Sequence, residues 1–167
     1  DSGLPLPPTI VQFDPLNTTP RDVNAAVTQA FTILPNAVND APEFTFINAD
    51  PMVVASLEDE GFVTKGLIDP ATIRKGPISA EDEVVQILSY SISADPNVFT
   101  AAGYPTLDLV TGNVTYQTAP NVNRHIPGLN FNVSVTLIDD GGTALGGVDR
   151  TTKSFSIDIA ELNDAPE

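Results

Sequence analysis

Acidic side chains occur in short clusters, and clustered carboxylates are the usual ligands of hard cations. Leu57–Gly61 reads LEDEG, Ser79–Glu83 reads SAEDE, and Ile138–Gly142 reads IDDGG. Each cluster falls at the end of an expected strand, where loops meet. Adjacent carboxylates repel one another unless a cation lies between them. Ca²⁺ takes about six to eight oxygens from such groups, whereas Mg²⁺ demands stricter geometry, so we expect calcium.

The charge balance of the chain is consistent with bound cations but does not require them. The 167 residues carry 22 Asp+Glu against 7 Lys+Arg, a formal charge of −15. Such a surface repels nucleic acid and anionic membranes, which need Lys and Arg to neutralise phosphate. The alternative reading is a halophilic or merely soluble acidic surface, and each cluster taken alone is more simply a solvated turn.

Other chemistries have few residues to support them. The chain has no Cys and a single His, His125, which leaves no disulfide, thiolate site or Ser-His-Asp triad to expect. Paired carboxylates could hydrolyse glycosides, but a chain without Trp lacks the usual aromatic platform of a sugar cleft. No apolar run approaches the roughly 20 residues needed to span a bilayer. We therefore expect a protein that is not an enzyme and does not insert into membranes.

The elements expected to position the clusters are β-strands. Apolar residues alternate with polar ones over Phe131–Leu137 and again over Phe155–Ile159, which is typical of half-buried strands. Fifteen Pro and eleven Gly punctuate the rest, as in folds of many short strands. The one possible helical patch is Asp69–Lys75. This pattern favours an all-β antiparallel sandwich.

An internal repeat defines the domain organisation. Residues 29–43 read QAFTILPNAVNDAPE and residues 153–167 read KSFSIDIAELNDAPE, so both segments place an alternating strand before NDAPE. Recurrence at domain spacing indicates tandem units. We assign residues 1–37 to a partial preceding repeat with its linker and residues 38–167 to one complete repeat.

Several segments together resemble a known family. Ile87–Gln117 resembles the middle of a cadherin repeat, with a Tyr-Ser-Ile strand before an Asp-x-x-Thr-Gly hairpin. Leu129–Gly142 resembles the cadherin strand that ends in an acidic residue and glycine. With the DGGTALGG loop and the Asn-Asp-Ala-Pro junctions, the chain is most similar to bacterial cadherin-like tandem repeats of large extracellular surface proteins of the RTX and adhesin type.

The resemblance implies a seven-stranded Greek-key antiparallel β-sandwich, similar to cadherin and immunoglobulin domains, with Ca²⁺ at the junctions between units. Asp158 and Glu161 both flank the position of a further family aspartate, and the sequence does not choose between them. The metal ligands implied by the resemblance are Asn39, Asp40, Glu58, Asp59, Asp82, Glu83, Asp139, Asp140, Asn163 and Asp164.

The function expected from the resemblance is structural. The repeat would stiffen a tandem array in an extracellular or cell-surface adhesin, with neighbouring repeats of the same chain as its partners and adhesion as the role of the whole. The alternative is a recognition module of a secreted protein that binds a cell-surface glycan or protein through a loop such as Ala101–Thr106.

Overall fold

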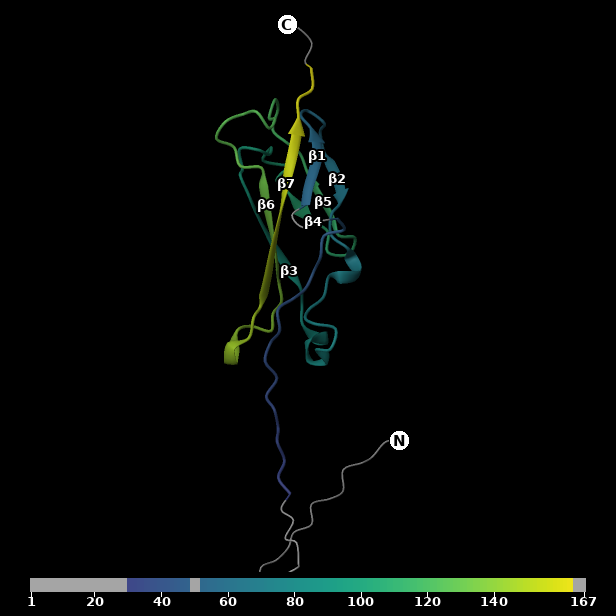
Figure 1. Cartoon of the computed structure of the whole chain (residues 1–167), viewed down its shortest axis with the longest axis vertical. Coiled ribbons are helices and arrows are strands. Elements are labelled where there is room, and N and C mark those ends of the chain that lie inside the picture. The colour runs from purple at the N-terminus through teal and green to yellow at the C-terminus, as the bar shows by residue number, and fades with distance from the viewer. Residues whose placement is uncertain (1–29, 49–51, 164–167) are drawn as a thin grey trace, which may run out of the picture. The chain divides into compact units, whose positions relative to one another are not determined.

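The computed structural model describes residues 30–48 and 52–163, and the chain divides into two units, residues 1–36 and 37–167. The second unit contains seven strands and three short 3₁₀ helices (Figure 1). The strands are β1 Met52–Leu57, β2 Val63–Gly66, β3 Ser89–Ala94, β4 Thr106–Leu107, β5 Asn113–Tyr116, β6 Asn132–Ile138 and β7 Arg150–Ala160. The 3₁₀ helices are η1 Pro70–Thr72, η2 Glu81–Val85 and η3 Ala144–Gly146.

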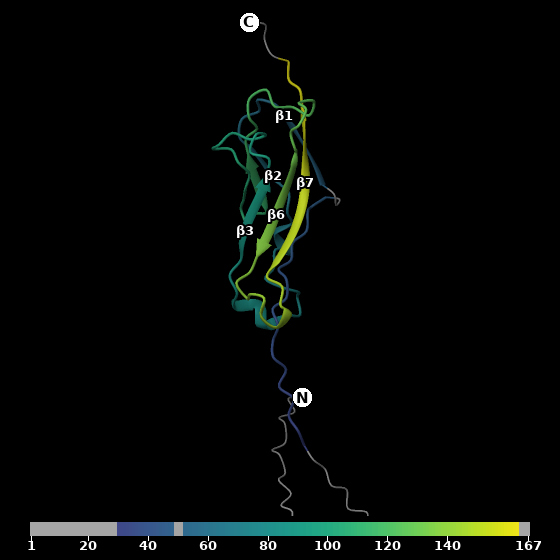
Figure 2. The ribbon, with the colours of Figure 1, turned by 90° about the vertical axis from the view of Figure 1, so that its left-hand side faces the viewer.

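The strands form two sheets. One has four strands in the order β1-β7-β6-β3, and the other has three in the order β2-β5-β4. Figure 2, turned by 90° from Figure 1, shows β3, β6 and β7 running alongside one another in the larger sheet. The prediction of an all-β sandwich is confirmed at this level: seven strands, two sheets and little helix.

One pairing differs from the expected antiparallel arrangement. β1 runs parallel to β7, with Met52 opposite Phe155 and Leu57 opposite Ala160. The other strand pairs are antiparallel. A parallel pair needs a long connection between its strands, and here nearly the whole repeat lies between β1 and β7.

Alternating apolar residues of both sheets form one core. On β7, Phe155, Ile157 and Ile159 are buried while their neighbours are not, as the sequence pattern predicts. Phe155 packs edge-to-face on Phe46 at 6.0 Å between ring centroids. Phe46 in turn bridges to Ile68 beyond the end of β2, so the segment before β1 ties one sheet to the other.

The expected helical patch is a single turn. Pro70–Thr72 forms η1, and the Asp69 carboxylate accepts a hydrogen bond from the backbone N–H of Ala71. Pro70 at the first position of η1 fits this start. Within the part of the chain that the structure describes, no helix has the length and apolar character of a membrane span.

Part of the predicted organisation lies outside the described residues. These are most of the partial repeat assigned to residues 1–37, and Asp164 among the predicted ligands. In the first unit, Phe31 and Ile33 belong to the described residues and are 83% and 74% exposed.

We predict that Gly112→Ala destabilises the repeat by about 3 kcal/mol. Gly112 has φ +70°, and a Cβ there would overlap the backbone carbonyl of Ile68. The Gly112 carbonyl also accepts hydrogen bonds from the Leu67 and Ile68 backbone N–H groups. Urea unfolding measures the change.

Gly128→Ala is the matched control. Gly128 has φ +85° but nothing within 4 Å of the added Cβ, so only the backbone strain of about 1 kcal/mol is expected. Equal losses in the two variants would show that the contact between the Gly112 turn and Ile68 contributes nothing.

Candidate metal centre

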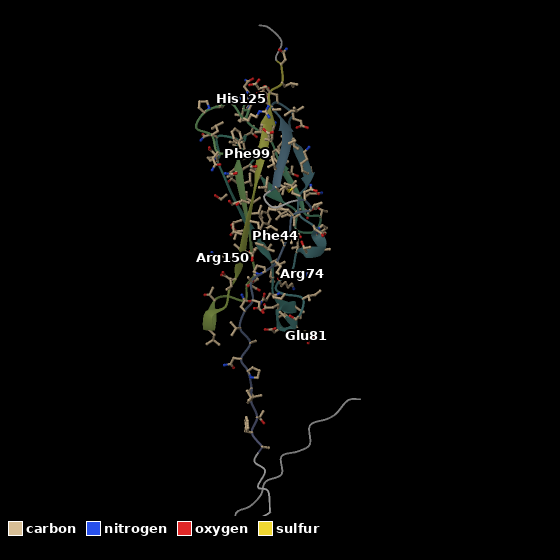
Figure 3. The ribbon with its side chains drawn as sticks, viewed as in Figure 1. Phe44, Arg74, Glu81, Phe99, His125 and Arg150 are labelled. Atoms are coloured by element: carbon tan, nitrogen blue, oxygen red, sulfur yellow. The ribbon has the colours of Figure 1, made fainter. Side chains whose placement is uncertain are left out.

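Four segments meet at the end of the sandwich where the repeat begins. They are the residues before β1, η2 with the residue after it, the end of β6, and the loop that leads into β7. Figure 1 shows η2 and η3 together at this end, and Figure 3 labels Glu81 of η2 there and His125 at the opposite end. We call the polar group at this site the entry cluster: Asn39, Asp40, Glu83, Gln86, Asp139 and Asp140.

Asn39 joins the entering chain to the β6–β7 end of the sheet. Its Nδ2 donates to Asp139 Oδ1 at 2.9 Å and to the Val148 carbonyl at 2.8 Å. The Val148 N–H donates to the Asn39 carbonyl at 2.9 Å. Asp139 is fixed in turn, because its N–H donates to the Asp149 carbonyl and its Oδ1 accepts from the Gly141 N–H.

Glu83 and Gln86 reach the cluster from the 3₁₀ turn. Side chains three residues apart eclipse one another in a 3₁₀ helix, which places Gln86 against Glu83. Gln86 Nε2 donates to Glu83 Oε2 and, at 2.6 Å, to Asn39 Oδ1. Glu83 Oε1 accepts from the Asp40 N–H at 3.0 Å.

The cluster buries two carboxylates without a matching positive charge. Glu83 is 2% exposed and Asp139 is 5% exposed. Among the described residues, no Lys, Arg or His forms an ion pair with either of them. Burying an unpaired charge is costly. A bound cation is the arrangement that would balance these two charges.

Two buried oxygens of the cluster also lack hydrogen-bond donors. Asp139 Oδ2 and Gln86 Oε1 are inaccessible to solvent and have no partner. Buried polar atoms normally find partners, and exceptions call for an explanation such as an ion. Both oxygens are of the type that coordinates Ca²⁺.

Glycine allows the cluster to close. A Cβ on Gly141 would overlap both Asn39 Oδ1 and Gln86 Nε2. The IDDGG segment therefore serves the site in two ways: Asp139 supplies a carboxylate, and Gly141 leaves room for two amide side chains.

The exposed acids of the predicted ligand set take outer positions. Asp40, Asp82 and Asp140 are exposed, and Asp140 Oδ1 accepts from the Ile87 N–H at 2.8 Å. No three Asp, Glu or His side chains of the described segments are grouped so that they could hold a metal ion by themselves. Any site built here therefore needs the amide oxygens of Asn39 and Gln86, or ligands from a neighbouring unit.

A second polar group lies at the opposite end, where β7 finishes; we call it the exit cluster, made of Glu58, Asp59, Asn121, Asn123 and the Leu162 backbone. Glu58 is 4% exposed and accepts from Asn123 Nδ2 at 3.0 Å and from the Leu162 N–H at 2.7 Å. These two hydrogen bonds lower the pKa of Glu58, and the one from Asn123 has the larger effect. Asp59, at φ +58°, accepts from the Asn121 N–H at 3.1 Å.

The remaining predicted ligand and the two undecided acids also lie near the exit cluster. Asn163 is exposed and follows Leu162. Asp158 pairs with Arg124 at 3.1 Å, and Glu161 lies 3.9 Å from His125. Both undecided acids therefore face cationic or protonatable side chains.

The structure thus separates the predicted ligands into two groups joined by β7. Eleven residues of strand span about 35 Å at 3.2–3.4 Å per residue, so one ion cannot serve both clusters. Sequence reasoning missed Gln86, Asn123 and Gly141. The available signals were an amide three residues after Glu83 and the first glycine of IDDGG, which is Gly141.

The comparisons with known proteins do not place the chain. No family model matches it, and no curated protein matches it in sequence.

We predict that the Glu58 carboxylate makes folding sensitive to acid. Because its folded pKa is lowered, its contribution to stability is complete above the unfolded-state pKa near 4.3 and is lost as the pH falls through the folded-state pKa. Glu58→Gln should therefore destabilise the repeat at pH 7, and its deficit relative to the wild type should shrink as the pH falls from about 5 through the folded-state pKa. Urea midpoints across this pH range measure both effects.

Glu81→Gln is the control for the loss of one negative charge, because Glu81 is exposed on η2. Its difference from the wild type should stay small over the same range. A Glu58→Gln deficit that does not change with pH would contradict the assignment.

Proposed function

We propose that residues 38–167 form a calcium-binding structural repeat of a tandem array. The observation that carries the proposal is the entry cluster, where Glu83 and Asp139 are buried without a cationic partner and Asp139 Oδ2 has no donor. Calcium suits this group because it accepts carboxylate, amide and backbone oxygens in flexible geometry. The chain carries seven Lys and Arg for its 22 acids, so protein cations are scarce.

The register of the internal repeat supports a site shared between units. Leu162 donates its N–H to Glu58 and immediately precedes Asn163. Val38 occupies the same place before Asn39, so its N–H would meet the Glu58 of a preceding repeat of the same kind. Asn39, about 3.8 Å further along the chain, contacts Asp139 of its own repeat. Carboxylates of two repeats would thus converge on one short linker and supply the ligands that a single repeat lacks.

The proposed consequence of binding is stiffness. A cation held by both ends removes bending freedom from the linker, and Pro42 beside it restricts the backbone further. Binding to the folded state alone stabilises that state by RT ln(1 + [L]/Kd). The calcium-loaded array would therefore be both more rigid and more stable than the calcium-free one.

The finer identity of the fold and its setting belong to the same proposal. We infer a Greek-key, cadherin-like sandwich from two sheets of four and three strands together with the Asn-Asp-Ala-Pro junctions. The partners are neighbouring repeats of the same chain. An extracellular or cell-surface setting, in an adhesin, is where free calcium is abundant enough for such a site.

We predict that calcium at about a hundredfold excess over Kd stabilises the wild type by about 2.7 kcal/mol. The corresponding rise in melting temperature is roughly 5–10 °C for a domain of this size. Asp139→Asn should abolish the rise. In EDTA this variant should be at least as stable as the wild type, because it removes an uncompensated buried charge while its amide oxygen still accepts from Asn39 and Gly141.

Calorimetric titration and thermal unfolding measure the two effects, with Glu81→Gln as the control for charge. A melting temperature of the wild type that is the same in calcium and in EDTA would refute calcium binding.

We also predict a change of shape in a protein of two such repeats in tandem. Small-angle scattering should show a larger maximum dimension and a narrower range of conformations in calcium than in EDTA, because the bound ion restricts the linker. With Asp139→Asn in the second repeat alone, the range of conformations in calcium should be as broad as in EDTA. Calcium binding without any change in this range would leave a metal site but refute the stiffening role.

A further inference from the structure

The amide of Gln86 lies where the entry cluster needs positive charge. A glutamine NH₂ has two donors, and both are used: one faces Glu83 Oε2 and the other Asn39 Oδ1 at 2.6 Å. Gln86 is the only side chain among the described residues that donates a hydrogen bond to Glu83. The positive end of the amide dipole therefore partly neutralises the buried carboxylate.

The other end of the same amide is unsatisfied. Gln86 Oε1 is buried without a donor, as is Asp139 Oδ2. An unpaired buried acceptor costs free energy. Reversing the amide would not recover this free energy without a cation, because Nε2 would then lose its hydrogen bonds to Glu83 and Asn39. This orientation therefore satisfies Glu83 and Asn39, whereas a cation among these oxygens would favour the reverse one.

We propose that Gln86 is a switch within the calcium site: its NH₂ binds Glu83 and Asn39 in the calcium-free protein, and its amide turns over on calcium binding so that Oε1 becomes a ligand. The inference rests on the proposed function, since it assigns a role at the proposed calcium site. The terminal torsion of glutamine is broad and roughly two-fold, so a half-turn exchanges Nε2 and Oε1 with little movement of the chain. A cation bound to the Glu83 and Asn39 oxygens would attract the amide oxygen of Gln86 and repel its NH₂ group.

The switch has a consequence for affinity. Calcium must displace two hydrogen bonds of Gln86 before it can bind Glu83 and Asn39. Gln86 therefore stabilises the calcium-free fold and weakens calcium binding relative to a site whose carboxylates face each other unscreened. A carboxylate at position 86 would have the opposite effect on both states.

The first test is Gln86→Glu, compared with Val85→Glu as a matched control. Val85 is adjacent and 82% exposed, so Val85→Glu adds the same charge in solvent and not among the buried oxygens of the cluster. Gln86→Glu should bind calcium about tenfold or more tightly than Val85→Glu, since ligand charge sets calcium affinity. In EDTA it should melt several degrees lower than Val85→Glu, because an acceptor then faces Glu83. Equal calcium affinities in the two variants would overturn the proposal.

The second test uses the wild type and does not depend on how the variant folds. The Gln86 side-chain NH₂ signals, assigned by ¹⁵N NMR, should show hydrogen bonding to carboxylate in EDTA and lose it on saturation with calcium. Unchanged NH₂ signals in a protein that binds calcium would overturn the switch and leave the proposed function standing. Absence of calcium binding by the wild type would overturn both.

Discussion

Uncompensated negative charge at the entry end is the constraint on which the rest of the structure depends. Glu83 and Asp139 are buried there in a chain with few cations. Arg150 pairs with Asp149 at 2.8 Å, Arg74 pairs with Glu43 at 3.7 Å and Lys75 donates to the Val84 carbonyl, so none of these three cations pairs with the buried acids. Four separate segments must converge to bury the two acids. The geometry of η2, of Gly141 and of the entering chain follows from that convergence.

β7 connects this end to the other. Its first five residues pair with β6 alone, Phe155 and Ser156 pair with both β6 and β1, and its last four residues pair with β1 alone. The loop before it is bonded to Asn39, and its last residue, Ala160, accepts the Glu58 N–H at 3.0 Å. Phe155, Ile157 and Ile159 bury its inner face in the core. The two polar clusters are therefore held at a fixed separation by one continuous, well-packed strand.

How far sequence reasoning reached depended on whether the signal was local. Alternation predicted the strands around Phe131–Leu137 and Phe155–Ile159, because side chains on a pleated strand have a period of two whatever their partners. The parallel pairing of β1 with β7 was not predictable, since nothing in either strand specifies which edge of a sheet it joins. The sequence does not distinguish the three acids of SAEDE, yet only Glu83 is buried, because the turn of η2 directs its side chain inward.

The amide partners were missed for a related reason. Clustered carboxylates predict a bound cation because like charges repel, whereas a neutral glutamine in the sequence predicts no partner. Gln86 becomes informative only when its neighbours are known: two acceptors on one side of its amide and no donor on the other. Asn123 is similar, since its importance lies in the buried Glu58 that it meets from 65 residues away. Neutral side chains complete both clusters, and their roles are set by tertiary structure.

The parallel pairing of β1 with β7 would help the proposed array to resist force along its length. The chain enters at the Asn39 end and reaches β1, which runs toward the exit end beside β7, after which the chain leaves through Leu162. A pull along such an array would draw β1 and β7 past each other. The ladder between Met52–Leu57 and Phe155–Ala160 would then resist in shear, with its hydrogen bonds loaded together instead of one after another. Metal at the junctions would stiffen the linkers, while this pairing protects the repeat between them, so the two features address different weak points of the same structure.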